Sequence, residues 1–154
     1  MREKFKETTG IPRFIVVVFI VQFVLFLTYW FNNRENNSLI YISGGILLLG
    51  IFLAFTRLKI EINGNAIEYK FLPFSKNRIL WKDVSKVEIV NISAVTDFLG
   101  WGIRWSPRFG WGYITNADHG IFITKNNGKK VTISIKDNTG LAHFLEENNL
   151  VGAS

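Results

Sequence analysis

The sequence predicts an α+β protein in which an N-terminal hairpin of two transmembrane helices is followed by a mostly antiparallel β domain with one C-terminal helix. Three observations support this fold class. Residues 14–31 and 39–55 contain no Asp, Glu, Lys or Arg. From residue 57 onward, apolar and polar residues alternate as in half-buried strands. Residues 141–145 then carry an apolar stripe with helical spacing.

The first apolar run, residues 14–31, reads FIVVVFIVQFVLFLTYWF. Val, Ile, Leu or Phe occupies 14 of its 18 positions, which outweighs the polar Gln22 and Thr28. As a helix it is about 27 Å long, close to the ~30 Å hydrocarbon core of a bilayer. Tyr29 and Trp30 stand near its end, where aromatic rings favour the headgroup level. These features predict a transmembrane helix.

The second run, residues 39–55, reads LIYISGGILLLGIFLAF and predicts a second span. Gly44, Gly45 and Gly50 allow it to approach the first span closely. Two alternatives are a pair of buried core helices in a soluble protein and a signal peptide in place of the first run. Core helices would leave only about a hundred residues to cover them, and the first run lacks a small-residue cleavage site.

Basic residues gather before the first run and after the second, whereas the link NNRENNS between them has only Arg34. These flanking residues are Arg2, Lys4, Lys6, Arg13, Arg57 and Lys59. By the positive-inside rule, both termini are cytoplasmic. The predicted organisation is a cytoplasmic N-terminal segment (1–13), an antiparallel transmembrane hairpin (14–56) and a cytoplasmic β domain (57–154).

The β domain opens with a predicted hairpin. Alternation over residues 58–63 and 67–71 is separated by the turn signal Asn63-Gly64-Asn65, and Pro73 ends the second strand. A third strand begins near Arg78 and a fourth includes residues 87–89. Between them, Trp81, Val84 and Val87 have the spacing of a helical turn, so both assignments stay open there.

A second hairpin and a helix are predicted near the C-terminus. Residues 121–123 and 131–135 alternate on either side of a turn centred on Asn127-Gly128. Asp137-Asn138-Thr139 supplies N-cap residues for a helix of roughly ten residues, whose apolar stripe is Leu141, Phe144 and Leu145. The prediction is therefore six or seven strands closed by one C-terminal helix.

Composition and motifs argue against several function classes. The chain has no Cys, which rules out disulfides and thiol chemistry. Its two histidines, His119 in a predicted loop and His143 on the terminal helix, lie near no recognisable nucleophile, metal or nucleotide motif. We therefore predict no enzyme activity, cofactor or metal. The net charge of +6 suits nucleic acid, an anionic membrane surface or the flanks of membrane spans; the flanks account for much of it, and we predict no nucleic-acid partner.

The densest candidate site is the segment FLGWGIRWSPRFGWGY, residues 98–113. Its tryptophans and arginines are Trp101, Arg104, Trp105, Arg108 and Trp111. Guanidinium groups bind phosphate bidentately and indole rings anchor at membrane interfaces, so the segment suits anionic lipid headgroups. It also suits nucleobase stacking or a protein or small-ligand site. The structural alternative is that the tryptophans fill the open end of a small barrel.

A second candidate site is the basic hairpin tip with Lys125, Lys129 and Lys130, together with Lys76 and Arg78 on an earlier predicted loop. An anionic leaflet attracts each such charge by about 1 kcal/mol when it lies near the surface. The alternative is an ordinary solvated turn.

The stretches ILWKDVSKV (79–87) and GWGIRWSP (100–107), with the Lys-rich hairpin and the terminal helix, resemble a bacterial family of small membrane proteins that carry pleckstrin-homology-like (PH-like) domains. The resemblance covers most of residues 57–150. It implies a PH-like barrel or sandwich with one C-terminal helix, and a location in the bacterial inner membrane. PH-like domains bind phosphoinositides, peptides or other proteins, and the fold alone does not choose among these.

Three functions fit these observations. The function that needs the fewest assumptions is a membrane-tethered, non-catalytic interaction or scaffolding module, with a membrane protein or a second copy of the chain as partner. The second is binding or sensing of anionic lipid. The third is an accessory subunit of a transport or envelope complex, because neither span carries the ionisable residues of an autonomous transporter.

Overall fold

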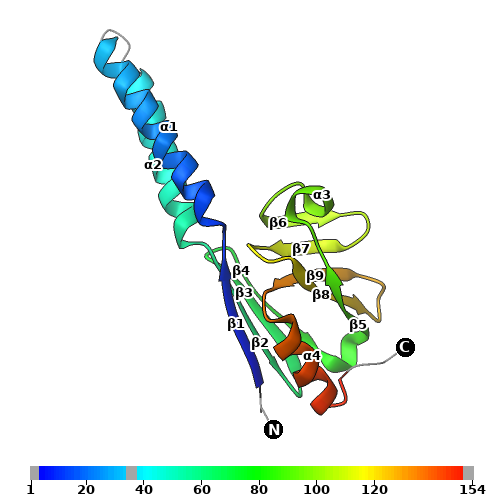
Figure 1. The fold of residues 1–154 in the computed structure, drawn as a ribbon. Helices are drawn as coiled ribbons and strands as arrows, with labels where there is room; N and C mark the ends of the chain where they lie inside the picture. Colours follow the sequence, from blue (N-terminus) through cyan, green and yellow to red (C-terminus); the bar gives the residue numbers. More distant parts are fainter. Residues whose placement is uncertain (1–3, 34–37, 151–154) are drawn as a thin grey trace. The chain divides into compact units, whose positions relative to one another are not determined.

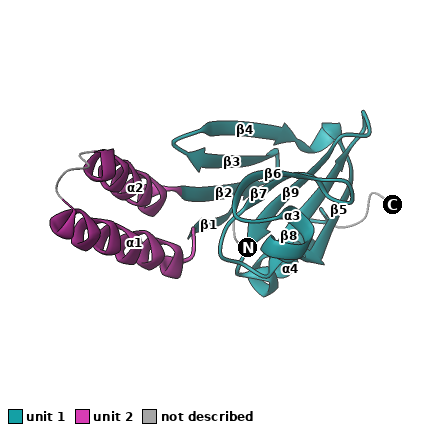
Figure 2. Ribbon diagram, turned by 90° about the horizontal axis from the view of Figure 1, so that it is seen from above, with its two compact units in different colours: residues 1–10, 57–154 teal, residues 11–56 magenta. Residues whose placement is uncertain are grey.

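The computed structural model describes residues 4–33 and 38–150, which form two compact units (Figures 1 and 2). One unit is helical and lies within residues 11–56. The other contains all the described strands and combines residues 4–10 with residues 57–150. Each unit is described by itself below.

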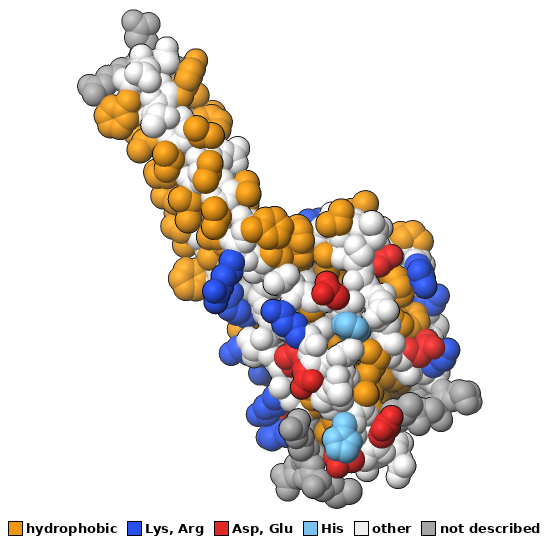
Figure 3. Space-filling model, viewed as in Figure 1, with side chains coloured by type: hydrophobic (Ala, Val, Ile, Leu, Met, Phe, Trp, Pro, Cys, Tyr) orange, Lys and Arg blue, Asp and Glu red, His pale blue; other side chains and the backbone are white. Residues whose placement is uncertain are grey.

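The helical unit consists of α1 (Arg13–Asn32) and α2 (Ser38–Phe55), within one residue of the predicted spans. No residue of α1 is buried, and in α2 only Ser43 and Gly50 are. A Cβ atom added at Gly50 would lie 2.8 Å from Phe19 Cβ, so this glycine allows the helices to pack closely. Apolar side chains cover the visible face of the helices (Figure 3). Both helices are long and apolar enough to cross a membrane.

The β unit contains two sheets. Sheet A has four antiparallel strands in sequential order: β1 (Lys4–Gly10), β2 (Arg57–Asn63), β3 (Ala66–Leu72) and β4 (Ser75–Leu80). Sheet B has five, in the spatial order β5 (Val84–Asn91), β8 (His119–Lys125), β9 (Lys130–Ile135), β7 (Gly110–Ile114) and β6 (Gly102–Ser106). The described residues thus hold nine strands instead of the predicted six or seven. The sheets are not closed into the predicted barrel.

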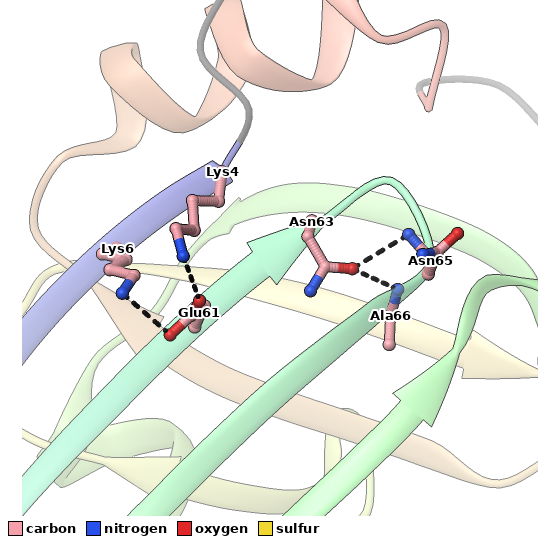
Figure 4. Close-up of polar contacts among 6 residues, drawn as sticks. All are labelled: Lys4, Lys6, Glu61, Asn63, Asn65 and Ala66. Carbon is pink, nitrogen blue, oxygen red and sulfur yellow. Dashed lines mark hydrogen bonds and ion pairs between the residues drawn. The ribbon is translucent and has the colours of Figure 1, made fainter.

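The first predicted hairpin is confirmed as β2 and β3. Its turn is closed by Asn63, whose Oδ1 accepts hydrogen bonds of 2.9 Å from the N–H groups of Asn65 and Ala66 (Figure 4). The next strand starts at Ser75 and not near Arg78, because the chain turns back directly after Pro73. Of the three residues with helical spacing, Trp81 lies in a short 3-10 turn, η1 (Trp81–Asp83), whereas Val84 and Val87 lie in strand β5.

Strand β1 corrects the prediction that residues 1–13 form a separate cytoplasmic segment. It pairs with β2 over its whole length, from Lys4–Asn63 to Gly10–Arg57. The helical unit is therefore inserted between two neighbouring strands of one sheet. Only Phe5 and Thr9 of β1 are buried, so apolar and polar residues alternate weakly there. This weak alternation explains why the strand was not predicted from the sequence.

Buried hydroxyl groups join β1 to sheet B. Thr9 Oγ1 lies 2.6 Å from Thr115 Oγ1, which lies 2.7 Å from Ser134 Oγ. Two residues before Thr9 in β1, the Glu7 carboxylate accepts hydrogen bonds of 2.7 and 2.9 Å from the N–H groups of Lys136 and Asp137. Strand β1 thereby connects sheet A to the start of the terminal helix.

The main apolar core lies between the two sheets and α4 (Asn138–Glu147). Helix α4 begins at the predicted N-cap, where Asp137 accepts a 2.8 Å hydrogen bond from the Gly140 N–H, and it buries the predicted stripe Leu141, Phe144 and Leu145. A second, smaller core surrounds the short helix α3 (Ala94–Phe98), and its buried members are Ile92, Phe98, Phe109 and Ile114.

Candidate functional site

The predicted Trp/Arg segment becomes the β6–β7 hairpin and the loop before it. Trp105 and Trp111 lie directly opposite each other on the two strands and share one face. They are 59% and 54% exposed, unlike tryptophans that fill the end of a barrel. On the same face, Ile103 and Tyr113 are the next cross-strand pair and pack against the main core. The two indole rings therefore extend an apolar face beyond the core.

Arg104 belongs to the opposite face of the hairpin. It pairs with Gly112, where an added Cβ would collide with the Phe98 ring of the smaller core. Its Nε donates a 3.2 Å hydrogen bond to the Trp101 carbonyl, and Trp101 packs partly against that same core. These two residues and the exposed indole pair are thus on different faces of sheet B.

The remaining predicted basic residues lie in loops or at strand ends. Arg108, in the β6–β7 turn, places its guanidinium carbon 4.7 Å from the centre of the Phe109 ring. Lys130 starts β9, and its carbonyl is so close to Gly110 that a Cβ there would collide with it. Lys125 and Lys129 close the predicted hairpin turn, with Lys125 N–H donating to the Lys129 carbonyl at 2.9 Å.

The eight predicted residues therefore do not form one surface. The register brings Trp105 and Trp111 together, and the Gly110 contact brings Lys130 close to the turn that carries Arg108. Arg104 and Trp101 lie on the face of the hairpin opposite to the two indole rings.

A better organised charged surface lies on the outer face of sheet A. The cross-strand register arranges its side chains in rows, and two adjacent rows carry most of the charge. One row is Lys6, Glu61, Glu68 and Arg78. The next is Thr8, Lys59, Lys70 and Lys76, which we term the basic row.

The first of these rows is neutralised internally. Lys6 Nζ lies 3.2 Å from a Glu61 carboxylate oxygen, and Lys4 Nζ approaches the other oxygen at 3.3 Å (Figure 4). Arg78 Nε lies 3.4 Å from Glu68. The hydrogen bond from Lys6, with that from Lys4 and the charges of both, lowers the pKa of Glu61 despite the opposing effect of partial burial.

The basic row has no such compensation. Lys59 lies directly opposite Lys70, and Lys70 lies directly opposite Lys76. None of these three lysines forms an ion pair within residues 4–33 and 38–150. Like charges directly opposite each other destabilise a sheet. The row thus presents three neighbouring positive charges that folding alone does not require.

An exposed apolar turn adjoins the basic row. The turn comprises Leu72, which ends β3, and Pro73 and Phe74, which lead to β4. Leu72 lies in register with Arg57, one row beyond Lys59 and Lys70. Leu72 is 38% and Phe74 is 56% exposed. The Phe74 N–H donates a 2.8 Å hydrogen bond to the Phe71 carbonyl, and the two rings stack at 6.0 Å. The turn is therefore held in shape although Leu72 and Phe74 stay exposed.

A shallow depression of about 190 Å³ crosses this face of sheet A, lined by side chains that include Lys6, Lys59, Glu61 and Lys70. The sequence contained a signal for these residues, since Lys59 alternates with apolar neighbours. The row itself could not be predicted, because it depends on the pairing of three strands and on placing Lys76 in β4 instead of a loop.

Groups suited to catalysis are dispersed in the structure. His119 starts β8 and does not lie in the predicted loop, while His143 is exposed on α4, 3.4 Å from Glu147. Within the described part of the chain, no three His, Asp or Glu side chains are grouped as a metal site needs. Burial, and then the neighbouring Tyr113, raises the pKa of the Tyr69 hydroxyl above its ordinary value.

Comparison with known protein families finds none whose pattern matches this chain, and no curated protein matches it either.

Proposed function

We propose that the chain is a membrane-tethered, non-catalytic interaction module, in which the helical unit anchors the β unit at a bilayer surface and the β unit binds a protein partner. The observation that carries this proposal is the insertion of two apolar helices between paired strands. Only Ile11 and Pro12 separate β1 from α1, and only Thr56 separates α2 from β2. Two such short links would hold the β unit within a few residues of the membrane.

The pairing of β1 with β2 supports a hairpin topology. Because Gly10 and Arg57 are partners in one sheet, the two ends of the helical unit must emerge on the same side of any membrane that it crosses. Arg13 and Arg57 then flank the spans, which favours the cytoplasmic side. We place the chain in a bacterial inner membrane with both termini cytoplasmic, in line with the resemblance to small PH-like membrane proteins.

The exposed indole pair is the surface that best suits a protein partner. Trp105 and Trp111 form a cross-strand aromatic pair, and the turn that joins their two strands carries the cationic Arg108. Trp and Arg are enriched among the residues that dominate binding energy at protein interfaces. The partner is either another membrane protein or a second copy of the chain, and a role as an accessory subunit of a larger complex would use the same surface.

The test is site-specific photo-crosslinking of the full chain in native membranes. A benzophenone amino acid at position 105 is expected to give one discrete adduct, and the same group at Asn127, in the β8–β9 turn, is the matched control. Replacing Trp111 by Ala should abolish the adduct. Release of the chain from membranes by alkaline carbonate would refute the anchoring, whereas a retained chain without an adduct at position 105 would refute the partner surface.

A further inference from the structure

We propose that the basic row and the apolar turn of sheet A form a docking surface for an anionic bilayer. Lys59, Lys70 and Lys76 would contact lipid phosphates, while Leu72 and Phe74 would enter the headgroup region. This inference rests on the membrane anchoring proposed above and adds a second attachment that would fix the orientation of the β unit.

This surface lies close along the chain to the two apolar helices. The Gly10–Arg57 pair is the last of the β1–β2 ladder, directly before the links to α1 and α2. The basic row lies two residues farther along the strands, about 7 Å away at the usual rise per residue. Lysine side chains are long enough to reach back over such a distance while their stems lie on the sheet. The apolar turn is at the same end of the sheet, because Leu72 is in register with Arg57.

Charge is distributed unevenly on this face of sheet A. The row that contains Glu61 and Glu68 lies farther from those strand ends and is internally paired. The row nearer to them carries only positive charge. Neighbouring strands are about 4.8 Å apart, so adjacent lysines of the row lie within one Debye length of each other and act together on an anionic surface. Each lysine at an anionic leaflet is expected to favour docking by about fivefold.

The apolar turn has the side chains of a membrane-interface segment. Exposed aromatic and aliphatic side chains beside lysines are typical of segments that lie in a membrane interface. The hydrogen bond from the Phe74 N–H to the Phe71 carbonyl holds the turn in place, so docking would cost little conformational entropy. An acidic protein surface could satisfy the lysines as well. The bilayer is favoured because the same strand ends lead directly into the two apolar helices.

The test uses the full chain, reconstituted in vesicles of phosphatidylcholine alone or mixed with phosphatidylglycerol. The chain has no cysteine, so Phe74→Cys can carry a single apolar bimane fluorophore that replaces the ring. Brominated lipids in the same vesicles should quench it strongly with the anionic lipid, weakly without it, and less at high salt. Lys59→Gln, Lys70→Gln and Lys76→Gln together should reduce the quenching several-fold. The matched control, Lys125→Gln, Lys129→Gln and Lys130→Gln, removes the same charge from the β8–β9 turn and should leave it unchanged.

Quenching that does not depend on lipid charge, or that falls equally in both triple variants, would overturn the proposal. Amide hydrogen exchange of residues 70–76 in the unlabelled chain provides a second readout, with slower exchange expected only in anionic vesicles. Flotation with both kinds of vesicle separates the two proposals. A chain that floats without lipid-dependent quenching refutes docking alone, whereas a chain that does not float refutes the anchoring on which docking depends.

Discussion

The two candidate surfaces of the β unit are built in opposite ways. In the β6–β7 hairpin, the residues that stand out are neighbours in the sequence, and strand alternation sends Arg104 and Trp105 to opposite faces of sheet B. On sheet A, Lys59, Lys70 and Lys76 belong to three different strands, and the register places them side by side. A surface of a β protein is therefore defined by residues across strands more than by runs along the chain.

The difference also separates structural from functional residues. Part of the Trp/Arg segment maintains the smaller core, since Gly112 makes room for Phe98. The basic row contributes nothing comparable, because its lysines are solvated and repel one another. Perturbing the Gly112 face of the hairpin should mainly change stability, and perturbing the basic row should mainly change interactions with anionic surfaces.

The largest effect is expected for Phe98→Ala. Phe98 is buried and stacks on Phe109 at 5.8 Å, so its truncation should lower the free energy of unfolding of the β unit by about 3–5 kcal/mol. Urea unfolding in non-ionic micelles, followed by tryptophan fluorescence, measures this. The control Val95→Ala changes an exposed residue of the same helix and should stay within about 0.5 kcal/mol. If Phe98→Ala and Val95→Ala both changed the free energy of unfolding only slightly, the smaller core would not support the hairpin.

The next effect concerns the junction of the two sheets. Thr115→Val keeps the side-chain shape but removes the hydroxyl between Thr9 and Ser134, which leaves two buried hydroxyls with fewer partners. The expected loss is about 1–3 kcal/mol in the same unfolding experiment. Thr124→Val, at a half-buried strand position, is the control, with an expected change below about 0.5 kcal/mol. A loss no greater than that of the control would show that the Thr9–Thr115–Ser134 hydroxyl contacts do not stabilise the attachment of β1.

Strong local patterns predicted much of the fold. The two apolar runs, the Asn63-Gly64-Asn65 turn and the Asp137 cap each combine a residue type with a spacing that one structure satisfies, and each was found within a residue or two of its predicted place. Strand β1 was missed because its whole pairing partner, β2, lies beyond the inserted helices. The parallel pairing of β7 with β9 has no local signature either.

Candidate sites were predicted less well for a related reason. Composition identified Trp105 and Trp111, which do lie together. It could not separate them from Arg104, since a hairpin register was needed to assign the faces. It also missed Lys70 entirely, because a single lysine in an alternating strand is what any solvated face shows until its cross-strand neighbours are known.

Two substitutions that remove a charge, one in each row of sheet A, should change the free energy of unfolding by smaller amounts and with opposite signs. Lys70→Gln removes a charge that lies between Lys59 and Lys76, so it should raise the free energy of unfolding at low salt by about 0.2–1 kcal/mol. Arg78→Gln breaks the ion pair with Glu68 and should lower it by a similar or smaller amount. High salt should diminish both changes. If both variants were destabilised, the basic row would not be under electrostatic strain.

The smallest expected effect is the pH dependence contributed by Glu61. Its neighbours Lys6 and Lys4 lower its pKa from the ordinary value of 4.5, so the folded β unit binds this proton less readily than the unfolded chain does. The resulting stability is present above the unfolded pKa and is lost as the pH falls through the lower, folded pKa. Glu61→Gln should therefore flatten the decline in unfolding free energy between about pH 5 and pH 3. The paired variant Lys4→Gln, Lys6→Gln should flatten it as well, and adding Glu61→Gln to that variant should bring little further change. Additive effects of the two changes would mean that the lysines do not act through this carboxylate, and that the row beside the basic row is not neutralised by the pairs seen in the structure.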